Sequence, residues 1–336
     1  MTATRVPHAQ LAALIEAIFL RHGCSEPVAR LLAGNMADAE RDGALSHGIF
    51  RLAGNLGSLD SGWVDGRATP VIEDVAPGLL RGDGRNGFTL PVLAMARERL
   101  TQKARANGIA LLAIRNAHHF SAVWPDIEPF ARQGLIALAF INSMSSVVPY
   151  GGSKKLYGTN PLGFAVPRQG RDPLVFDQAS SGWSNGDVQI ARREGRRLPE
   201  GIGVDRDGNP TTDPAAVLEG GALLPFGGHK GSSIAMMMEI MGAALAGGDY
   251  SFEIDWSAYP GAATPHGGQT YIVIDPGRGN PRGFAARIET LVEAIRDAGQ
   301  ERLPSDRRYA NRRESESLGI AIAADELDRL RRLAAD

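Results

Sequence analysis

The sequence predicts a soluble protein of mixed α/β (α+β) class with roughly two domains. Its 336 residues are 43% hydrophobic and 22% charged, which is ordinary for a globular protein with a sizeable core. Apolar residues follow helical spacing through about the first 60 positions, and strand-length apolar runs then alternate with helices. This order predicts a helical N-terminal part followed by a part that contains a sheet.

Charge, hydropathy and cysteine content exclude several classes of function. The formal net charge is −2, so the chain has no overall basic field for nucleic acid. No apolar run approaches the roughly 18–20 residues of a membrane span, and the N-terminus lacks an apolar signal segment. The single cysteine, Cys24, excludes an internal disulfide and a cysteine-based metal cluster. We therefore expect a cytoplasmic protein with no nucleic-acid partner, no membrane association and no metal.

Three helices are predicted in the N-terminal part. The first ends at His22-Gly23, and its buried stripe consists of Leu11, Leu14, Ile15, Ile18 and Phe19. The second begins near Ser25, has Pro27 in its first turn and closes at Gly43. The third is predicted over residues 46–56. Together they predict an α-helical cap.

A literal G-x-G-x-x-G pattern runs from Gly82 to Gly87, between short predicted strands (71–75 and 79–81) and a predicted helix (91–106). A dinucleotide-binding fold needs a firm buried strand before this pattern and an acidic residue about 20 positions after it, for the ribose. The strand here is weak, and the next one (109–114) ends in Arg115-Asn116. We therefore interpret the pattern as a turn and not as a Rossmann fingerprint.

Strands and helices continue along the rest of the chain. We predict strands over residues 135–142, 162–166, 174–176 and 271–274, and helices over 125–132, 187–193, 288–295 and 326–333. Residues 198–220 are rich in turn formers and are predicted to be a loop. Within this loop Asp205, Asp207 and Asn209 resemble a calcium loop. Pro210 stands where that loop needs glycine, so we interpret them as a solvated turn.

A glycine-rich loop, Pro225 to Gly231, runs directly into an apolar segment over residues 232–246. Its glycines let a ligand approach the backbone amides, and His229 and Lys230 add donors. The positive end of the following helix suits an anion such as phosphate. A tight turn before a core helix explains the same residues equally well, because the loop is not a Walker A loop. The helix is apolar on nearly every face, so we expect it to be buried.

Polar residues gather at further positions, each of which also has a plain structural interpretation. His47 and Arg51 are four residues apart on a predicted helix, where an imidazole beside a guanidinium suits carboxylate binding and proton transfer. An ordinary surface face of a helix is the simpler interpretation. His118-His119 follows a strand and needs further partners to hold a metal. Asp187 by itself is an ordinary exposed carboxylate. The arginines between residues 302 and 313 form a solvated run or a phosphate clamp.

Five ordered motifs together resemble the malate/L-lactate dehydrogenase-like oxidoreductases, a family distinct from the Rossmann lactate dehydrogenases. They are Asp42-Gly-Ala-Leu-Ser-His-Gly, His119-Phe, Gly158-Thr-Asn-Pro, Asp177-Gln-Ala-Ser-Ser and Pro225-Phe-Gly-Gly-His-Lys-Gly. The resemblance runs over nearly the whole chain. Further motifs are similar to one branch of the family, the Δ1-piperideine-2-carboxylate/Δ1-pyrroline-2-carboxylate reductases. They are Ser46-His-Gly-Ile-Phe-Arg, Trp124-Pro-Asp-Ile-Glu-Pro-Phe, Gly186-Asp-Val-Gln-Ile-Ala, Gly203-Val-Asp-Arg-Asp-Gly and Arg302-Leu-Pro-Ser-Asp-Arg-Arg-Tyr.

The resemblance implies a homodimer whose cofactor domain is not a Rossmann fold but a mostly antiparallel sheet module inserted into a helical α/β domain. Residues 1–115 together with 285–336 would form the substrate and dimerisation domain, and residues 116–284 the NADPH-binding domain. The implied activity is NADPH-dependent reduction of cyclic imino acids, by hydride transfer to C2. Δ1-piperideine-2-carboxylate would give L-pipecolate, and Δ1-pyrroline-2-carboxylate would give L-proline. The alternative is a NAD(P)-dependent 2-hydroxy-acid dehydrogenase of the malate or lactate type.

The resemblance also implies roles for individual residues. Ser46, His47 and Asp187 would handle the proton, although the residue matching His119 is the proposed acid/base in other members. Arg51 would hold the substrate carboxylate, and Thr159 would lie at the substrate. The implied cofactor contacts are Phe120, Ser121, Ala122, Val123, Trp124, Asp177, Gln178, Ala179, His229, Lys230, Ser305, Asp306, Arg307, Arg308, Tyr309, Ala310 and Asn311. The clustered Arg307, Arg308 and Arg312 are candidates for the 2′-phosphate of NADPH.

A Ser-His-Asp hydrolase is the main alternative from another class. Ser46 and His47 are sequence neighbours and the chain has no G-x-S-x-G elbow, which argues against a hydrolase. Ser180-Ser181-Gly-Trp183 is bulkier than the resemblance leads us to expect, which affects the expected shape of the pocket. The reductase interpretation requires that His47 and Lys230 meet across one cleft around the nicotinamide.

Overall fold

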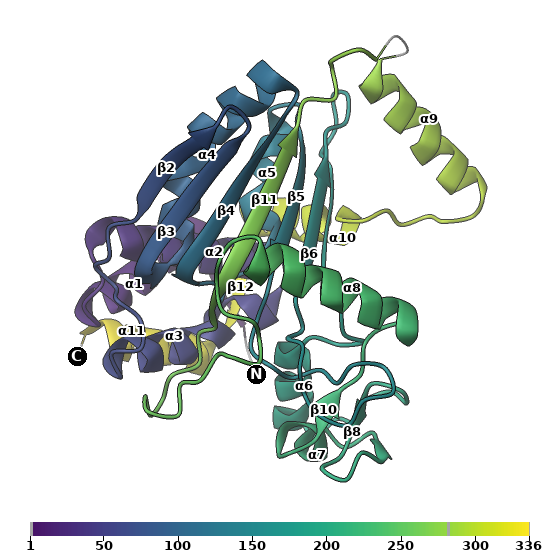
Figure 1. The fold of residues 1–336 in the computed structure, drawn as a ribbon. Coiled ribbons are helices and arrows are strands. Elements are labelled where there is room, and N and C mark those ends of the chain that lie inside the picture. The colour runs from purple at the N-terminus through teal and green to yellow at the C-terminus, as the bar shows by residue number, and fades with distance from the viewer. Residues whose placement is uncertain (1–2, 281–282, 336) are drawn as a thin grey trace.

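The computed structural model describes residues 3–280 and 283–335 and is built around a seven-stranded sheet with the order β2-β3-β4-β11-β5-β6-β7 (Figure 1). The strands are β2 Val71–Ala76, β3 Leu79–Phe88, β4 Ile109–His118, β5 Ile136–Ile141, β6 Leu162–Val166, β7 Leu174–Gln178 and β11 His266–Ile274. Within this sheet β3 and β4 are parallel, and every other neighbouring pair is antiparallel. A Rossmann sheet is parallel, so this order confirms the predicted α/β (α+β), non-Rossmann fold.

Helices cover both faces of the sheet. α4 (Thr89–Asn107) and α5 (Trp124–Arg132) pack on one face, and α8 (His229–Glu239) with the π-helical turn η3 (Ile240–Ala244) crosses the other (Figure 1). Successive residues of β11 face opposite layers. The Tyr271 hydroxyl donates to Asp126 of α5 at 2.8 Å, and the Thr270 hydroxyl donates to the Met241 carbonyl of η3 at 2.7 Å. The sheet is thus fixed from both sides by buried hydrogen bonds.

A helical unit packs against one end of the sheet and is made from both ends of the chain (Figure 1). The predicted helices form α1 (His8–Arg21), α2 (Glu26–Arg41) and α11 (Ala324–Ala335), and α1 packs on both α2 and α11. β1 (Ala3–Val6) pairs antiparallel with β12 (Ile320–Ala323), and we did not predict either strand. The sheet module is therefore inserted between two chain segments that fold together. The domain boundaries at residues 115 and 285 stay a prediction; β4 runs across the first of them.

A small lobe lies below α8 in Figure 1. It contains α6 (Asn185–Arg193), α7 (Pro214–Leu218) and a three-stranded sheet of β8 (Gly203–Val204), β9 (Pro210–Thr211) and β10 (Ala222–Leu223). Residues 198–220 are therefore not wholly a loop, as we had predicted. The lobe has its own apolar cluster, made of Val147, Val188, Ala191, Leu198, Val217 and Leu223. Asp205 accepts hydrogen bonds from the backbone of Asp207 and Asn209, which is the geometry of a turn.

Two local predictions in the first 90 residues are wrong. The predicted helix over 46–56 is two 3₁₀ turns, η1 (Leu45–His47) and η2 (Ile49–Arg51), followed by α3 (Leu52–Asp60). The backbone breaks at Gly48, where the buried Glu40 carboxylate accepts the Ile49 N–H at 2.7 Å and so interrupts helical pairing. The stretch from Gly82 to Gly87 is not a separate turn but the irregular second half of β3, with Arg85 and Asn86 at positive φ.

The apolar helix after the glycine-rich loop is buried on one side only. α8 begins at His229, so His229 and Lys230 belong to its first turn. We expected the helix to be enclosed on nearly every face, but Met236 and Ile240 are each 50% exposed. Its buried side packs against β5 and β11, where a Cβ on Gly268 would lie 2.0 Å from the Gly242 carbonyl oxygen. The sequence pattern could not show this, because both sides of the helix are apolar.

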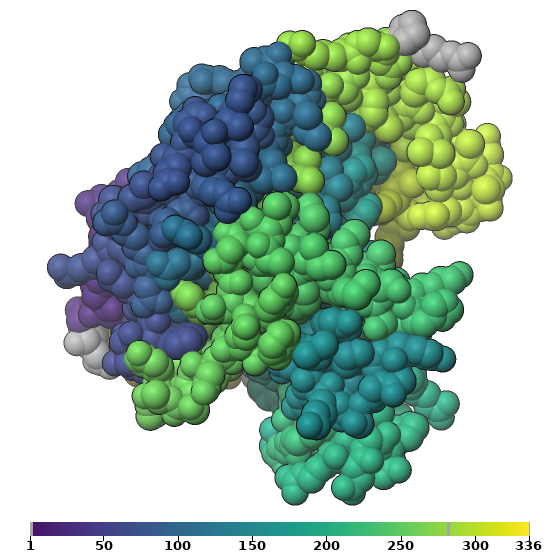
Figure 2. Space-filling view, viewed as in Figure 1, coloured from purple at the N-terminus to yellow at the C-terminus, as the bar shows by residue number. Residues whose placement is uncertain are grey.

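The C-terminal third adds two helices. α9 (Phe284–Asp297) projects from the body at the upper right of Figures 1 and 2, and Glu289 ties it to Arg168. α10 (Asp306–Leu318) contains most of the arginine run, which is therefore helical and in part buried. In the described ranges, 3–280 and 283–335, no helix is long and apolar enough to cross a membrane.

Arg312 of α10 is clamped between two buried carboxylates. Its Nε donates to Asp42 at 2.9 Å and its Nη1 donates to Glu128 at 2.7 Å. Asp42 follows α2 and Glu128 lies on α5, so one guanidinium joins three helices. Burial alone would raise the pKa of Asp42, but the bonds from Arg312 and Arg41 outweigh burial and lower it. Arg312 is therefore not available to the phosphate for which we had considered it.

We predict that Arg312→Gln lowers the free energy of unfolding by about 3 kcal/mol, because it removes the cation that two buried carboxylates share and leaves Asp42 with Arg41 alone and Glu128 with Arg132 alone. Arg313→Gln is the matched control. Arg313 lies on the same helix, its side chain is 66% exposed, and its ion pair with Asp172 is at the surface. That substitution should cost no more than about 1 kcal/mol. Urea unfolding followed by circular dichroism measures both, and equal losses would contradict the assigned role of the cluster.

Candidate active site

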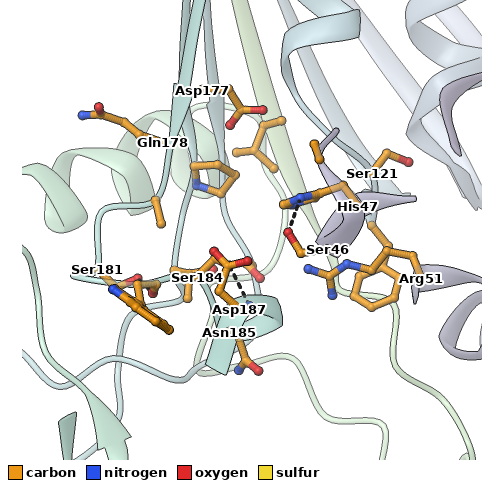
Figure 3. A pocket seen from close by; sticks show the side chains of 18 of the residues that line it. Ser46, His47, Arg51, Ser121, Asp177, Gln178, Ser181, Ser184, Asn185 and Asp187 are labelled. Carbon is orange, nitrogen blue, oxygen red and sulfur yellow. Dashed lines mark hydrogen bonds between the residues drawn. The ribbon is translucent and has the colours of Figure 1, made fainter. Parts of the chain in front are cut away.

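A cavity of about 800 Å³ opens between the small lobe, the η1–η2 turns and the ends of the sheet strands (Figure 3). In Figure 3, Ser46, His47 and Arg51 lie on one side, and Asp187 of α6 lies across from them. The cavity is lined by Gly43, Ala44, Leu45, Ser46, His47, Arg51, His119, Phe120, Ser121, Trp124, Ile141, Asn142, Ser143, Met144, Thr159, Pro161, Asp177, Gln178, Ala179, Ser181, Gly182, Trp183, Ser184, Asn185, Asp187, Ile190, Arg196, Phe226, Pro265, Arg307 and Arg308.

Ser46 and His47 form a hydrogen-bonded pair on the η1 turn. The distance from Ser46 Oγ to His47 Nδ1 is 3.2 Å. Desolvation, together with the positive charges of Arg51 and Arg308, lowers the pKa of His47 to about 3. His47 is therefore neutral at neutral pH in this field. A neutral imidazole next to a hydroxyl can accept a proton or pass one on.

Arg51 is a buried guanidinium that faces the cavity. Its side chain lies over the ring of Phe120, with the guanidinium carbon 4.3 Å from the ring centroid. Its Nε is buried and has no hydrogen-bond partner among the residues that the structure describes. Burial lowers the pKa of Arg51 to about 10, against the opposing charge of Asp187. Arg51 is thus still a cation at neutral pH, and a buried cation with an unsatisfied donor favours an anionic ligand.

Asp187 comes to the cavity on the first turn of α6. The Ser184 hydroxyl caps this helix by accepting the Asp187 N–H at 3.0 Å, and a carboxylate there is favoured by the helix dipole. The neighbouring Gly186 lets α6 approach the η turns: a Cβ there would lie 2.9 Å from Arg51 Nη2. The Ser184 cap and the small Gly186 thus position the Asp187 carboxylate opposite Ser46 and Arg51.

His119 is held from behind by a buried carboxylate. Its Nε2 donates to Asp126 at 2.9 Å, and the Tyr271 hydroxyl donates to the same carboxylate oxygen at 2.8 Å. Both His119 and Asp126 are buried, and His119 lines the cavity. Because Nε2 is engaged with Asp126, Nδ1 is the ring nitrogen left for a cavity ligand.

The other end of the cavity is formed by β7, the start of α5 and the start of α10. Asp177 accepts the backbone N–H groups of Val123 and Trp124 at 2.9 and 3.1 Å and so caps α5. Burial raises the pKa of the Asp177 carboxyl, and these bonds and the charge of Arg308 oppose the rise. Arg308 stacks on Trp124, with its guanidinium carbon 4.3 Å from the ring centroid. Arg307 is exposed and forms no ion pair in the described part of the chain.

The structure brings most of the predicted site residues together in this one cavity. The residues that line it are Ser46, His47, Arg51, His119, Phe120, Ser121, Trp124, Thr159, Asp177, Gln178, Ala179, Asp187, Arg307 and Arg308. Several predicted cofactor contacts lie outside its lining, namely Ala122, Val123, His229, Lys230, Ser305, Asp306, Tyr309, Ala310 and Asn311. The first two are buried in the core behind the wall, and Tyr309 is also buried.

Local hydrogen bonds account for some of the residues outside the lining. Ser305 bonds to the backbone of Val175 on the edge strand β7, and Asn311 donates to the Asp42 carbonyl at 3.2 Å. The expected meeting of His47 and Lys230 is not seen in the cavity lining. The glycine-rich loop reaches the cavity through Phe226 instead.

Sequence reasoning missed the residues that support the site from behind. Asp126 and Glu239 are both buried, at 1% and 5% exposure. Each is a charged residue next to large apolar ones in the sequence (Asp126-Ile127 and Met238-Glu239-Ile240). A carboxylate inside an apolar stretch must find donors in the interior, so this pattern was a usable indication.

Residues 6–331 match the family described as malate/L-lactate dehydrogenase, and the chain therefore belongs to that family. It is a family of NAD(P)-dependent dehydrogenases and reductases. Among the residues that the structure describes, no group of three or more histidine, cysteine, aspartate or glutamate side chains could hold a metal ion.

Particular relatives are similar over nearly their whole length. The chain is 57% identical to the Δ1-pyrroline-2-carboxylate/Δ1-piperideine-2-carboxylate reductase of Pseudomonas putida, over 99% of this chain and 97% of the relative. It is 39% identical to the (2R)-3-sulfolactate dehydrogenase (NADP+) of Chromohalobacter salexigens, over 97% of each. The crystal structure of Δ1-piperideine-2-carboxylate reductase from Pseudomonas syringae pv. tomato has a TM-score of 0.97 and 57% identity, over 98% of this chain and 99% of that one. The resemblance inferred from the motifs is confirmed.

Proposed function

We propose that this chain is an NADPH-dependent reductase of cyclic imino acids. It would convert Δ1-piperideine-2-carboxylate to L-pipecolate and Δ1-pyrroline-2-carboxylate to L-proline. The observation that carries the proposal is the buried Arg51, whose Nε lacks a partner in the described structure, beside the proton-handling groups Ser46, His47 and Asp187. The names of the relatives that are 57% identical point to the same substrates.

The substrate carboxylate would bind Arg51. A guanidinium offers parallel N–H donors that match a carboxylate, and charge-assisted bonds of this kind contribute about 1.5–3 kcal/mol each. The ring of Phe120 stacks on the guanidinium and holds its plane. A bound carboxylate would offset the positive charge that depresses the pKa of His47. Substrate binding would therefore remove the electrostatic part of the lowering of the His47 pKa, whereas the larger part, which comes from burial, would remain.

The residues at the far end of the cavity suit a phosphate-bearing cofactor. Arg307 and Arg308 both line the cavity, and neither forms an ion pair with a carboxylate in the described ranges. Together with residues 120–124 and 177–179 they would hold NADPH, and the guanidinium groups match phosphate geometry. When bound, NADPH supplies the hydride that C2 of the imine receives. The protein's part is to orient the substrate and to manage the proton.

Proton delivery would come from the histidine side of the cavity. Protonation of the imine nitrogen makes C2 electrophilic, and Asp187 would favour the resulting iminium cation. We assign the proton relay to Ser46, His47 and Asp187. His119 is the alternative donor, because it lines the same cavity and the buried Asp126 fixes its ring through Nε2. The two assignments are separated by mutation, as described below.

The second candidate function is a 2-hydroxy-acid dehydrogenase, favoured by the 39% identity to a sulfolactate dehydrogenase. The same arginine would bind the acid, and a histidine would protonate a carbonyl oxygen instead of an imine nitrogen. The homodimeric state, the cytoplasmic location and the division into domains at residues 115 and 285 are also our proposals. Sedimentation velocity would report the oligomeric state directly.

The first test is the oxidation of NADPH, followed at 340 nm, with each imine, pyruvate, oxaloacetate and an ester control. We expect turnover with the imines. Arg51→Ala should raise KM for the imino acid and lower kcat/KM by roughly 10- to 150-fold, the equivalent of about 1.5–3 kcal/mol, with KM for NADPH nearly unchanged. Arg193→Ala is the control. Like that of Arg51, the guanidinium of Arg193 lies over the ring of Phe50, but Arg193 is exposed and outside the cavity lining. A loss of NADPH affinity in Arg51→Ala would contradict the assignment.

The second test decides which histidine delivers the proton. His47→Ala should lower kcat by roughly 10²–10⁴-fold, the usual cost of losing a general acid or base. If His47→Ala turns over almost normally while His119→Ala and Asp126→Asn lose this factor, the role belongs to His119. Steady-state kinetics at saturating NADPH measure all three variants.

The third test concerns the choice of NADPH over NADH. We predict that Arg307→Glu narrows the ratio of kcat/KM for NADPH to that for NADH, because the 2′-phosphate then meets a negative charge. Arg313→Glu is the control on the same helix, with its exposed side chain outside the cavity lining. A ratio that Arg307→Glu leaves unchanged would remove Arg307 from the cofactor site.

A further inference from the structure

Glu239 is a buried carboxylate at the point where α8 changes from an α-helix to the π-helical turn η3. It is 5% exposed and lies outside the cavity lining. None of the ion pairs in the described ranges, 3–280 and 283–335, involves it. A buried carboxylate without a cation is costly unless several N–H donors satisfy it. Its hydrogen bonds therefore show what keeps it in the interior.

Three N–H donors from two distant segments converge on Glu239. Its Oε1 accepts from Asn160 Nδ2 at 2.7 Å and from the Gly158 N–H at 3.4 Å. Its Oε2 accepts from the Ser251 N–H at 3.0 Å. Only a carboxylate accepts at both oxygens without bringing a hydrogen of its own toward these donors. The site is thus matched to glutamate and not to its amide.

Asn160 connects Glu239 to the cavity wall by hydrogen bonds. It is fully buried with φ of +32°, a left-handed value that asparagine tolerates better than most residues. Its Oδ1 accepts the Ser143 N–H at 2.9 Å and the Ser251 hydroxyl at 3.3 Å. Ser143 and Thr159 both line the cavity. One carboxylate and one amide therefore hold together the segments that carry these two wall residues.

Thr159 is fixed from its other side as well. Its carbonyl accepts the Ser180 N–H at 2.8 Å and the Ser180 hydroxyl at 3.1 Å. Glu239 accepts from the Gly158 backbone and from the Asn160 side chain, so the residues on both sides of Thr159 are tied to it. The side chain that we assign to the substrate is thus presented from a doubly anchored loop.

We propose that Glu239 is a positioning residue for the substrate wall, which acts through Asn160 to set the place of Thr159. This inference rests on the proposed function, in which Thr159 lies at the substrate. The effect should fall on the carboxylate substrate and not on NADPH, because the arginines of the cofactor end belong to α10. The hydrogen bonds of Glu239 and Asn160 within the described residues go to other segments. Displacement of a substrate-positioning group by about 1 Å can cost on the order of 100-fold in rate.

Glu239→Gln is the first variant. Its amide nitrogen must face one of the three N–H donors, so the loop at Thr159 has to shift. We expect kcat/KM for the imino acid to fall by roughly 10- to 100-fold, while the Kd of NADPH, measured by fluorescence titration, changes less than about twofold. Equal changes in both parameters, or none, would overturn the proposal.

The matched control is Thr89→Val. Thr89 is also fully buried and donates to Gln269 at 3.0 Å, and neither residue lines the cavity. The control loses a buried hydrogen bond elsewhere in the same molecule. If it reproduces the kinetic loss of Glu239→Gln, general destabilisation explains that loss and the proposal fails.

The double variant Glu239→Gln with Asn160→Asp tests the route through Asn160. It exchanges donor for acceptor: the new amide at 239 can donate to the new carboxylate at 160, which still accepts from Ser143. We expect part of the lost kcat/KM to return, and this variant also keeps the test open if Glu239→Gln alone does not fold. If kcat/KM of the double variant does not exceed that of Asn160→Asp alone, the assigned route through Asn160 is overturned.

The design also separates this inference from the proposed activity. Every variant is assayed on whichever carboxylate substrate the wild-type protein reduces: an imine, pyruvate or oxaloacetate. A wild type that reduces only the oxo acids would overturn the imine reductase proposal and leave the positioning test intact. A wild type that reduces none of them would overturn both.

Discussion

The guanidinium of Arg312, held between Asp42 and Glu128, is the interaction on which the architecture of the site depends. It lies on a helix near the C-terminus, and its partners lie at the end of α2 and on α5. The η1 turn with Ser46 and His47 begins a few residues after Asp42, and α10 also carries Arg307 and Arg308. The η1 turn at one end of the cavity and the start of α10 at the other are therefore both attached to one buried ion cluster, which fixes the distance between them. Such a cluster costs desolvation, and its bidentate geometry and multiple bonds compensate for that cost.

The electrostatics of the cavity follow from what is buried around it. Desolvation keeps His47 neutral by lowering its pKa, and the positive charges of Arg51 and Arg308 add to this effect. Asp177 is committed to the N-terminus of α5 and Asp126 to His119, so these carboxylates brace the wall. The balance of charge in the cavity favours an anionic ligand at each end. An acid substrate and a phosphate-bearing cofactor fit that balance, whereas an uncharged ester does not.

Most helices and strands could be predicted because their cause is local. Apolar spacing identified the cores of α1, α2 and α11, and β6 has the predicted bounds. Predictions failed where a distant residue decides the backbone. Glu40 interrupts the helix expected after residue 46, and the pairing of β1 with β12 joins residues more than 300 positions apart. The exposure of Met236 and Ile240 also depended on which side of α8 the sheet would cover.

By itself, the sequence determined the family and most of the chemical groups in the cavity, including Ser46, His47, Arg51, His119 and Asp187. These residues lie in short ordered motifs that can be read from the sequence without the fold. Tertiary structure alone decided that Arg51 Nε has no hydrogen-bond partner in the described part of the chain, that Arg312 belongs to an ion cluster, and that Glu239 supports Thr159. The reason is physical: identity and periodicity are encoded in neighbouring residues, whereas burial and hydrogen-bond satisfaction depend on segments that meet only when the chain is folded.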